Sequence, residues 1–84
     1  MTYEVVFLNT FLRQFKKLSI DLQERIKQRI HELVEKPYLG LRLKGQLEEF
    51  WKDRVGDYRI IYKIEENTKR IVFYDVDIRK KVYG

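Results

Sequence analysis

The stretch that most constrains the fold is residues 50–64, FWKDRVGDYRIIYKI. Aromatic, β-branched and long basic residues flank the short segment Val55-Gly56-Asp57-Tyr58, and this composition is typical of two β-strands joined by a tight turn. Gly56 suits the turn because glycine adopts positive φ angles without a steric penalty. The stretch is therefore predicted to form a β-hairpin.

This predicted hairpin gathers basic side chains on one face. Side chains alternate between faces along a strand, so Lys52 and Arg54 share a face. In the second strand, one face carries Tyr58, Ile60, Tyr62 and Ile64, and the other carries Arg59, Ile61 and Lys63. A hairpin that brings Lys52, Arg54 and Arg59 together is a candidate phosphate site. The alternative is that they are solvated charges at a sheet edge.

The residues before the hairpin predict one strand and two helices. Residues 2–8 are rich in β-formers and predict the first strand. The next segment has apolar residues at helical spacing, with Asn9 or Thr10 as its candidate cap. In the longer helix that follows, Asp21 and Glu24 have the spacing of a capping box. Its expected buried face comprises Leu22, Ile26, Ile30, Leu33 and Val34.

The remaining segments predict a loop and a final strand. Pro37 is expected to stop the second helix at residues 35–36, because proline disfavours a helical residue before it. The loop that follows contains a possible extended piece at residues 41–43. Residues 70–78 read as the last strand. Its predicted core side comprises Val72, Tyr74, Val76 and Ile78.

Together these elements predict an α+β fold with the order βααβββ. Two N-terminal helices form an αα-hairpin that packs on one face of a four-stranded, mainly antiparallel sheet. The other face is left open and carries the charged residues. Because the chain is short and has no visible linker or repeat, residues 1–84 are expected to form a single domain.

The composition favours an anionic partner and excludes several kinds of site. Lys plus Arg number 18 against 13 acidic residues, a net charge of +5, which suits nucleic acid or an acidic protein. There is no cysteine and one histidine, His31, so no metal or cofactor is expected. His31 is predicted to be an exposed helix residue, although proton transfer is chemically open to it. No signal peptide or membrane-spanning run is visible, so we expect a cytoplasmic protein with no membrane partner.

Several segments resemble the core signature of the RelE/ParE toxin superfamily. They are Leu43-Lys44-Gly45, residues 51–62 (WKDRVGDYRIIY), and the closing residues 79–83 (RKKVY). With the preceding helices, the resemblance covers nearly the whole chain. It implies the RelE-like fold and a RelE-type toxin of a RelBE-like toxin–antitoxin system.

The RelE branch implies an endonuclease that cuts mRNA codons in the A site of the ribosome. Such a cut needs no metal when the 2′-OH of the RNA attacks the adjacent phosphate. The enzyme must then align the backbone, stabilise the charge and move protons. The resemblance implies a catalytic set of Lys52, Arg59, Arg79 and Tyr83. Arg59 and Arg79 would bind the phosphate, and Lys52 and Tyr83 would transfer protons.

Three further basic residues are expected to hold the RNA backbone, namely Lys44, Arg54 and Arg42. Two alternatives stay open at this point. Arg59 could form a structural ion pair with Asp75 or Asp77, and Tyr83 could anchor the tail to the core. The chain also departs from many relatives at Ile78, where they carry a histidine before the C-terminal arginine.

The resemblance also implies partners. They are a cognate RelB-like antitoxin, the ribosome with its mRNA, and a possible higher-order toxin–antitoxin complex on operator DNA. Antitoxins of this family are small and often acidic, which suits a net charge of +5. Two other functions stay open: a ParE-like toxin that binds DNA gyrase without nuclease activity, and an inactive binding relic.

Overall fold

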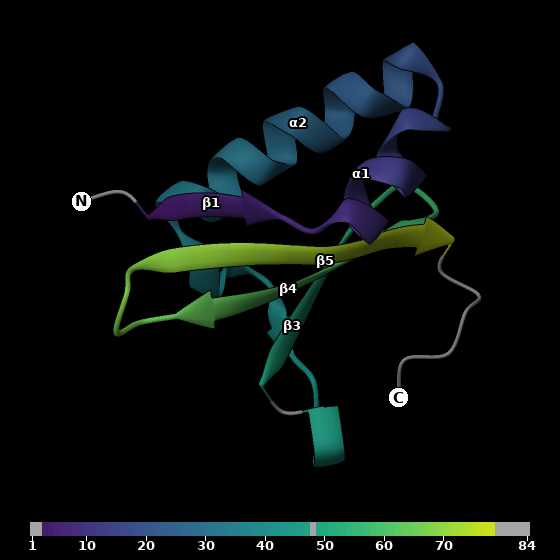
Figure 1. Cartoon of the computed structure of the whole chain (residues 1–84). Coiled ribbons are helices and arrows are strands. Elements are labelled where there is room, and N and C mark those ends of the chain that lie inside the picture. The colour runs from purple at the N-terminus through teal and green to yellow at the C-terminus, as the bar shows by residue number, and fades with distance from the viewer. Residues whose placement is uncertain (1–2, 48, 79–84) are drawn as a thin grey trace.

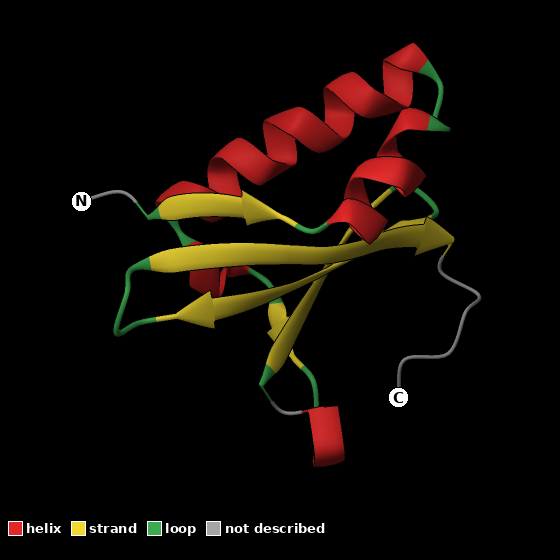
Figure 2. Ribbon diagram, viewed as in Figure 1, coloured by secondary structure: helices red, strands yellow, loops and turns green. Residues whose placement is uncertain are grey.

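The computed structural model describes residues 3–47 and 49–78, and its helices and strands are labelled in Figure 1. In chain order the elements are β1 (Glu4–Phe7), α1 (Asn9–Lys16), α2 (Ile20–Glu35), the 3-10 turn η1 (Pro37–Leu39), β2 (Leu41–Arg42), the 3-10 turn η2 (Gly45–Leu47), β3 (Phe50–Val55), β4 (Tyr58–Glu65) and β5 (Arg70–Ile78). Both helices lie on the same side of the sheet (Figure 2). None of the helices in the described ranges is long and apolar enough to cross a membrane.

The sheet confirms the α+β arrangement but has five strands, so the expectation of four is wrong. The strand order is β1-β5-β4-β3-β2. The pairs β5–β4, β4–β3 and β3–β2 are antiparallel, whereas β1 runs parallel to β5. The additional strand is β2, which forms because Leu41 and Arg42 pair with Lys52 and Trp51. The extended piece considered for residues 41–43 is thus a short edge strand.

Both helices begin differently from the expected positions. α2 is capped by Ser19, whose hydroxyl accepts a hydrogen bond from the Leu22 backbone N–H at 3.2 Å. Asp21 therefore lies inside the first turn, where its charge favours the positive end of the helix dipole. α1 follows Leu8 and has no side-chain cap, and Asn9 is already helical. The Leu8 N–H donates a hydrogen bond to the Phe73 carbonyl at 3.1 Å, so β5 holds the residue from which α1 begins.

The core lies between the helices and the sheet. Its fully buried large side chains are Phe11, Ile26, Leu33, Ile60, Tyr62, Ile71, Phe73 and Val76. The predicted buried face of α2 is confirmed, because Ile26, Ile30 and Leu33 are buried. The predicted alternation of β4 is also confirmed, since Ile60 and Tyr62 belong to this core cluster.

The predicted core side of β5 is wrong for its first half. Ile71 and Phe73 are buried in the core, and Val76 follows them after a step of three residues. The reason is a β-bulge, because Tyr62 pairs with Phe73 but Ile61 pairs with Asp75. Tyr74 is the extra residue, and it moves the alternation of faces by one position.

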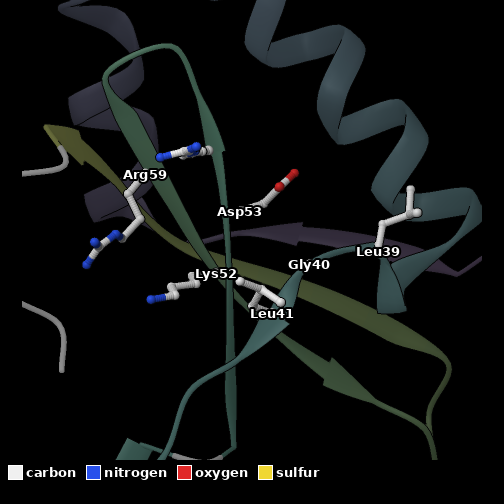
Figure 3. A pocket seen from close by; sticks show the side chains of 7 residues that line it. Leu39, Gly40, Leu41, Lys52, Asp53 and Arg59 are labelled. Atoms are coloured by element: carbon white, nitrogen blue, oxygen red, sulfur yellow. The ribbon is translucent and has the colours of Figure 1, made fainter.

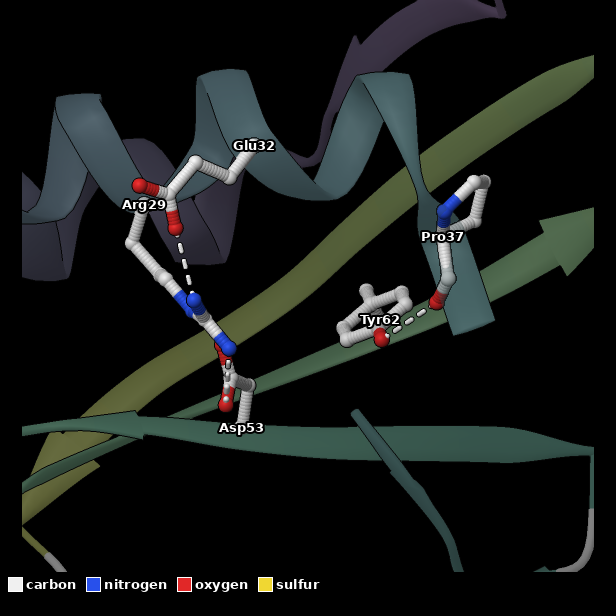
Figure 4. Close-up of polar contacts among 5 residues, drawn as sticks. All are labelled: Arg29, Glu32, Pro37, Asp53 and Tyr62. Carbon is white, nitrogen blue, oxygen red and sulfur yellow. Dashed lines mark hydrogen bonds and ion pairs between the residues drawn. The ribbon is translucent and has the colours of Figure 1, made fainter. Parts of the chain in front are cut away.

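One buried hydrogen bond fixes the segment between α2 and β2 (Figure 4). The hydroxyl of Tyr62 donates to the Pro37 carbonyl at 2.7 Å, and burial raises the pKa of Tyr62 to about 12. Gly40 packs so closely here that an added Cβ would lie 2.4 Å from the Tyr62 hydroxyl and 2.6 Å from the Lys52 carbonyl oxygen. Glycine is therefore required at position 40 by space rather than by its φ angle.

We expect Gly40→Ala to lower the free energy of unfolding by about 1–3 kcal/mol, the usual cost of overpacking. The new methyl group would push the loop away from β3 and break the bond between Tyr62 and Pro37. Urea denaturation followed by far-UV circular dichroism measures the change. As a control, Tyr62→Phe removes only the hydroxyl and should cost about 1 kcal/mol. Unchanged stability of Gly40→Ala would contradict this account of the packing.

A second polar cluster joins the start of β1 to the turn between β4 and β5. Tyr3 donates a hydrogen bond to Glu66 at 2.7 Å, and Tyr38 donates to the same carboxylate oxygen. Lys69 forms an ion pair with the other oxygen at 2.9 Å. The bond from Tyr38, then those from Lys69 and Tyr3, lower the pKa of Glu66 to about 2. The same carboxylate raises the pKa of Tyr38 to about 12.

This lowered pKa predicts an acid-dependent loss of stability. Because the carboxylate is favoured in the folded state, its contribution is complete above about pH 4.5 and disappears as the pH falls toward 2. The melting temperature of the wild type should therefore exceed that of Glu66→Gln at neutral pH, and the gap should close below pH 4.5. Glu24→Gln, which removes a surface ion pair of 3.7 Å to Lys27, is the control. A gap that does not change with pH would refute the coupling.

Candidate functional site

Three cations meet on the sheet face opposite the helices, as the sequence predicts. Arg54 of β3 lies directly across from Arg59 of β4, and Lys52 lies across from Ile61. Paired residues share a face, and Ile60 faces the core, so all three cations project away from the helices. Figure 3 shows Lys52 and Arg59 pointing to one side of β3 and Asp53 to the other. We call Lys52, Arg54 and Arg59 the cationic patch.

A cavity of about 370 Å³ lies beside the cationic patch at the edge of the sheet (Figure 3). Its lining residues are Leu39, Gly40, Leu41, Lys52, Asp53, Arg54 and Arg59. The cavity exists because β2 is short and pairs only with Trp51 and Lys52, so β3 extends beyond it. Leu41, which is 68% exposed, lies across from Lys52 on the same face. The site is thus an open, cation-lined groove.

The cations of the patch differ in their surroundings. Lys52 and Arg59 are half-buried, and Arg54 is exposed. Within residues 3–47 and 49–78, the side chains of Lys52 and Arg54 form no hydrogen bond or ion pair. The β4–β5 register places Arg59 directly opposite Asp77, so one of its two considered acidic partners lies beside it. The patch therefore has charge available for an anionic ligand.

An ion-pair network braces the patch from behind (Figure 4). The Arg29 guanidinium of α2 binds both carboxylate oxygens of Asp53, one through Nη2 at 3.3 Å, and also binds Glu32 at 2.6 Å. The hydrogen bond to Asp53 raises the pKa of Arg29. Because Asp53 lies between Lys52 and Arg54 in β3, this network fixes the strand that carries them. It also neutralises a carboxylate next to the patch.

This network was not predicted from the sequence. The alternation of side chains along β3 could have indicated it, because Asp53 falls on the same face as Trp51, toward the core. A carboxylate on such a face is costly unless a cation pairs with it. The identity of that cation could not be read locally, because Arg29 lies 24 residues away.

Among the described residues, the two remaining expected site residues, Arg42 and Lys44, do not join the patch. Arg42 lies across from Trp51, whose ring packs against the core, so Arg42 is on the helix side of the edge strand. Lys44 is exposed in the loop after β2 and does not line the cavity. His31 is exposed on α2, on the far side of the sheet. Arg79 and Tyr83 lie outside the described residues.

The geometry of the site suits phosphate binding by side chains alone. Guanidinium and ammonium groups donate charge-assisted hydrogen bonds to phosphate oxygens and stabilise charge that develops on them. Among residues 3–47 and 49–78, no group of three His, Asp or Glu side chains is arranged to hold a metal ion.

Known structures share this fold over almost the whole chain. A chain of the RelBE2 toxin–antitoxin complex from Mycobacterium tuberculosis is 27% identical, with a TM-score of 0.86 over 94% of this chain and 100% of that one. A chain of the RelB–RelE complex from Methanococcus jannaschii is 28% identical, with a TM-score of 0.70 over 93% and 94%. The isolated E. coli RelE toxin is 20% identical, with a TM-score of 0.83 over 96% and 88%.

Comparison with protein-family models agrees with this structural similarity, although comparison with curated sequences gives no match. The family model described as the ParE toxin of the type II toxin-antitoxin system, parDE, matches residues 5–83. Because that match spans nearly all of the 84 residues, and because the fold is that of RelE toxins, this chain belongs to the ParE toxin family of type II toxin–antitoxin systems, within the RelE/ParE toxin superfamily.

Proposed function

We propose that this toxin is a ribosome-dependent endonuclease that cleaves mRNA in the A site, in the cytoplasm. The observation that carries the proposal is the cationic patch, which joins Lys52, Arg54 and Arg59 on an open sheet face beside a cavity of about 370 Å³. An RNA backbone brings a phosphate every nucleotide, and such a cluster complements it. The fold likeness to RelE toxins supports the same class of activity.

The proposed chemistry needs no bound metal. The 2′-OH attacks the neighbouring phosphorus, the bond to the 5′-oxygen breaks, and a 2′,3′-cyclic phosphate and a 5′-hydroxyl end result. Arg59 stabilises the negative charge on the non-bridging oxygens. Lys52 and Tyr83 transfer the two protons, so that one of them takes the proton of the 2′-OH and the other protonates the leaving 5′-oxygen. Arg79 and Tyr83, which lie outside the described residues, complete the proposed catalytic set. Arg54 holds the backbone beside it.

The comparison with solved structures also supports an antitoxin partner. The relatives from M. tuberculosis and M. jannaschii were solved as toxin–antitoxin complexes. We infer a RelB-like antitoxin that covers this toxin through complementary charge, since the chain carries a net charge of +5. Assembly of that complex on operator DNA is part of the same proposal.

A second function has one observation in its favour. The family model that matches the chain is that of the ParE toxin, and the resemblance to ParE-like toxins implies binding of DNA gyrase without nuclease activity. The cationic patch on the open face favours RNA cleavage, because clustered cations complement the closely spaced phosphates of an RNA backbone. Assays of mRNA cleavage and of gyrase supercoiling separate the two.

We expect Arg59→Ala to lower the rate of mRNA cleavage by about 100-fold or more, the usual effect of removing one donor to a developing oxyanion. The assay maps the 5′ ends of a defined mRNA on programmed ribosomes after the purified protein is added. Cuts should fall in A-site codons and should require ribosomes. Lys52→Ala should show a loss of similar size.

Arg13→Ala is the matched control, because it removes one exposed arginine from α1, on the helix side of the sheet. Its cleavage rate should equal that of the wild type. Intact mRNA at saturating protein, together with inhibition of gyrase supercoiling, would replace the nuclease proposal with the gyrase one. Full activity of Arg59→Ala would exclude the mechanism described above.

A further inference from the structure

The sheet face that carries the cationic patch also contains an apolar hollow. Its volume is about 320 Å³, and its lining residues are Leu8, Thr10, Leu43, Phe50, Ile61, Tyr74 and Asp75. Five of these side chains are apolar or aromatic, and only Thr10 and Asp75 bring polar groups other than the Tyr74 hydroxyl. A concave, mainly apolar site with a few polar groups is the usual form of a small-ligand site.

The strand register places the hollow next to the cationic patch. Lys52, Ile61 and Asp75 form one row across β3, β4 and β5. Arg54 and Arg59 form the next row toward the hairpin turn. Neighbouring rows of side chains on one face of a sheet are two residues apart along each strand, which is about 6.6 Å. This separation is comparable to the span from the phosphate of a nucleotide to its base.

Several contacts hold the walls of the hollow in place. The rings of Phe50 and Tyr74 pack edge to face, with centroids 4.9 Å apart and planes at 88°. Because of the β-bulge, Tyr74 has no partner in β4, and the neighbouring residues Tyr74 and Asp75 both line the hollow. Leu43 is tied to β3 by a hydrogen bond from its N–H to the Phe50 carbonyl at 2.9 Å. The hollow is therefore preformed.

We propose that this apolar hollow binds one nucleobase of an RNA strand whose phosphate lies on the cationic patch. The inference rests on the proposed function and names the part of the substrate that the patch cannot contact. Burial of a base against Ile61, Phe50 and Tyr74 removes apolar surface from water, and base–aromatic contact adds to this gain. The juxtaposed cations bind the attached phosphate and so orient the base.

The rim of the hollow predicts which bases bind best. A carboxylate offers about four acceptor positions, so Asp75 can accept a hydrogen bond from an exocyclic amino group in addition to its existing contact. Adenine, cytosine and guanine carry such a group, and uracil does not. We therefore expect the amino-bearing bases to bind about tenfold more tightly than uracil, the effect of one hydrogen bond to a charged group.

Methyl NMR of the wild-type protein tests the site without any substitution. Titration with AMP, CMP, GMP and UMP should move the methyl resonances of Ile61 and Leu43, because the ring current of a bound base acts at short range. The Lys52 amide should move with them as the phosphate binds. The methyl of Ile20, which is 72% exposed at the start of α2, should not move.

Variants of one ring then separate base binding from phosphate binding. Tyr74→Ala should weaken AMP binding by about tenfold, the usual effect of losing one base-stacking partner. It should leave the weak binding of inorganic phosphate unchanged. Tyr74→Phe should bind AMP as the wild type does, and Tyr38→Ala, which removes an exposed ring elsewhere, is the control. Thermal melting of each variant checks that it is folded.

The outcomes distinguish this inference from the proposed function. Shifts at Lys52 without shifts at Ile61 and Leu43, or no nucleotide binding at millimolar concentration, would overturn the nucleobase site. If mRNA is cleaved in either case, the nuclease proposal stands without it. Shifts in the hollow from an apolar peptide but from no nucleotide would assign it to a protein partner instead. Base-dependent shifts with no cleavage of mRNA would refute the nuclease proposal alone.

Discussion

The pairing of β3 with β4 is the interaction on which the site and much of the core depend. It places Lys52, Arg54 and Arg59 on the outer face. The same pairing turns Ile60 and Tyr62 inward, where they are fully buried. One hairpin therefore supplies both the cations of the site and the centre of the core. A slip of one residue in its register would exchange the two faces and destroy both.

The acidic and basic side chains of β3 lie on opposite faces of the sheet, so the carboxylate of Asp53 does not neutralise the cationic patch. Asp53 points toward the helices, where Arg29 pairs with it, while its neighbours Lys52 and Arg54 point outward. The carboxylate side chain is only 13% exposed, so loss of Arg29 would leave a largely desolvated charge, which typically costs about 3–5 kcal/mol. The brace thus stabilises the strand and preserves the positive potential of the open face.

The local patterns predicted a large part of this structure. The hairpin, the end of α2 before Pro37 and the strand at residues 70–78 are confirmed, because each depends on neighbours in sequence. The bulge at Tyr74 could not be predicted in this way, and neither could the pairing with β3 that makes the extended piece at residues 41–43 the strand β2. Both arise from pairing between strands, and neither leaves a periodic signal in its own segment.

The order of residues was enough to predict the types of the main elements, the alternation of β3 and β4, and the convergence of Lys52, Arg54 and Arg59. Alternation and turn chemistry act over a few residues, so they can be read locally. Three other features appear only in the folded chain: Arg42 faces away from the patch, Arg29 binds Asp53, and Tyr74 borders a hollow. These depend on strand register and on contacts between distant segments, which are selected by packing of the whole chain.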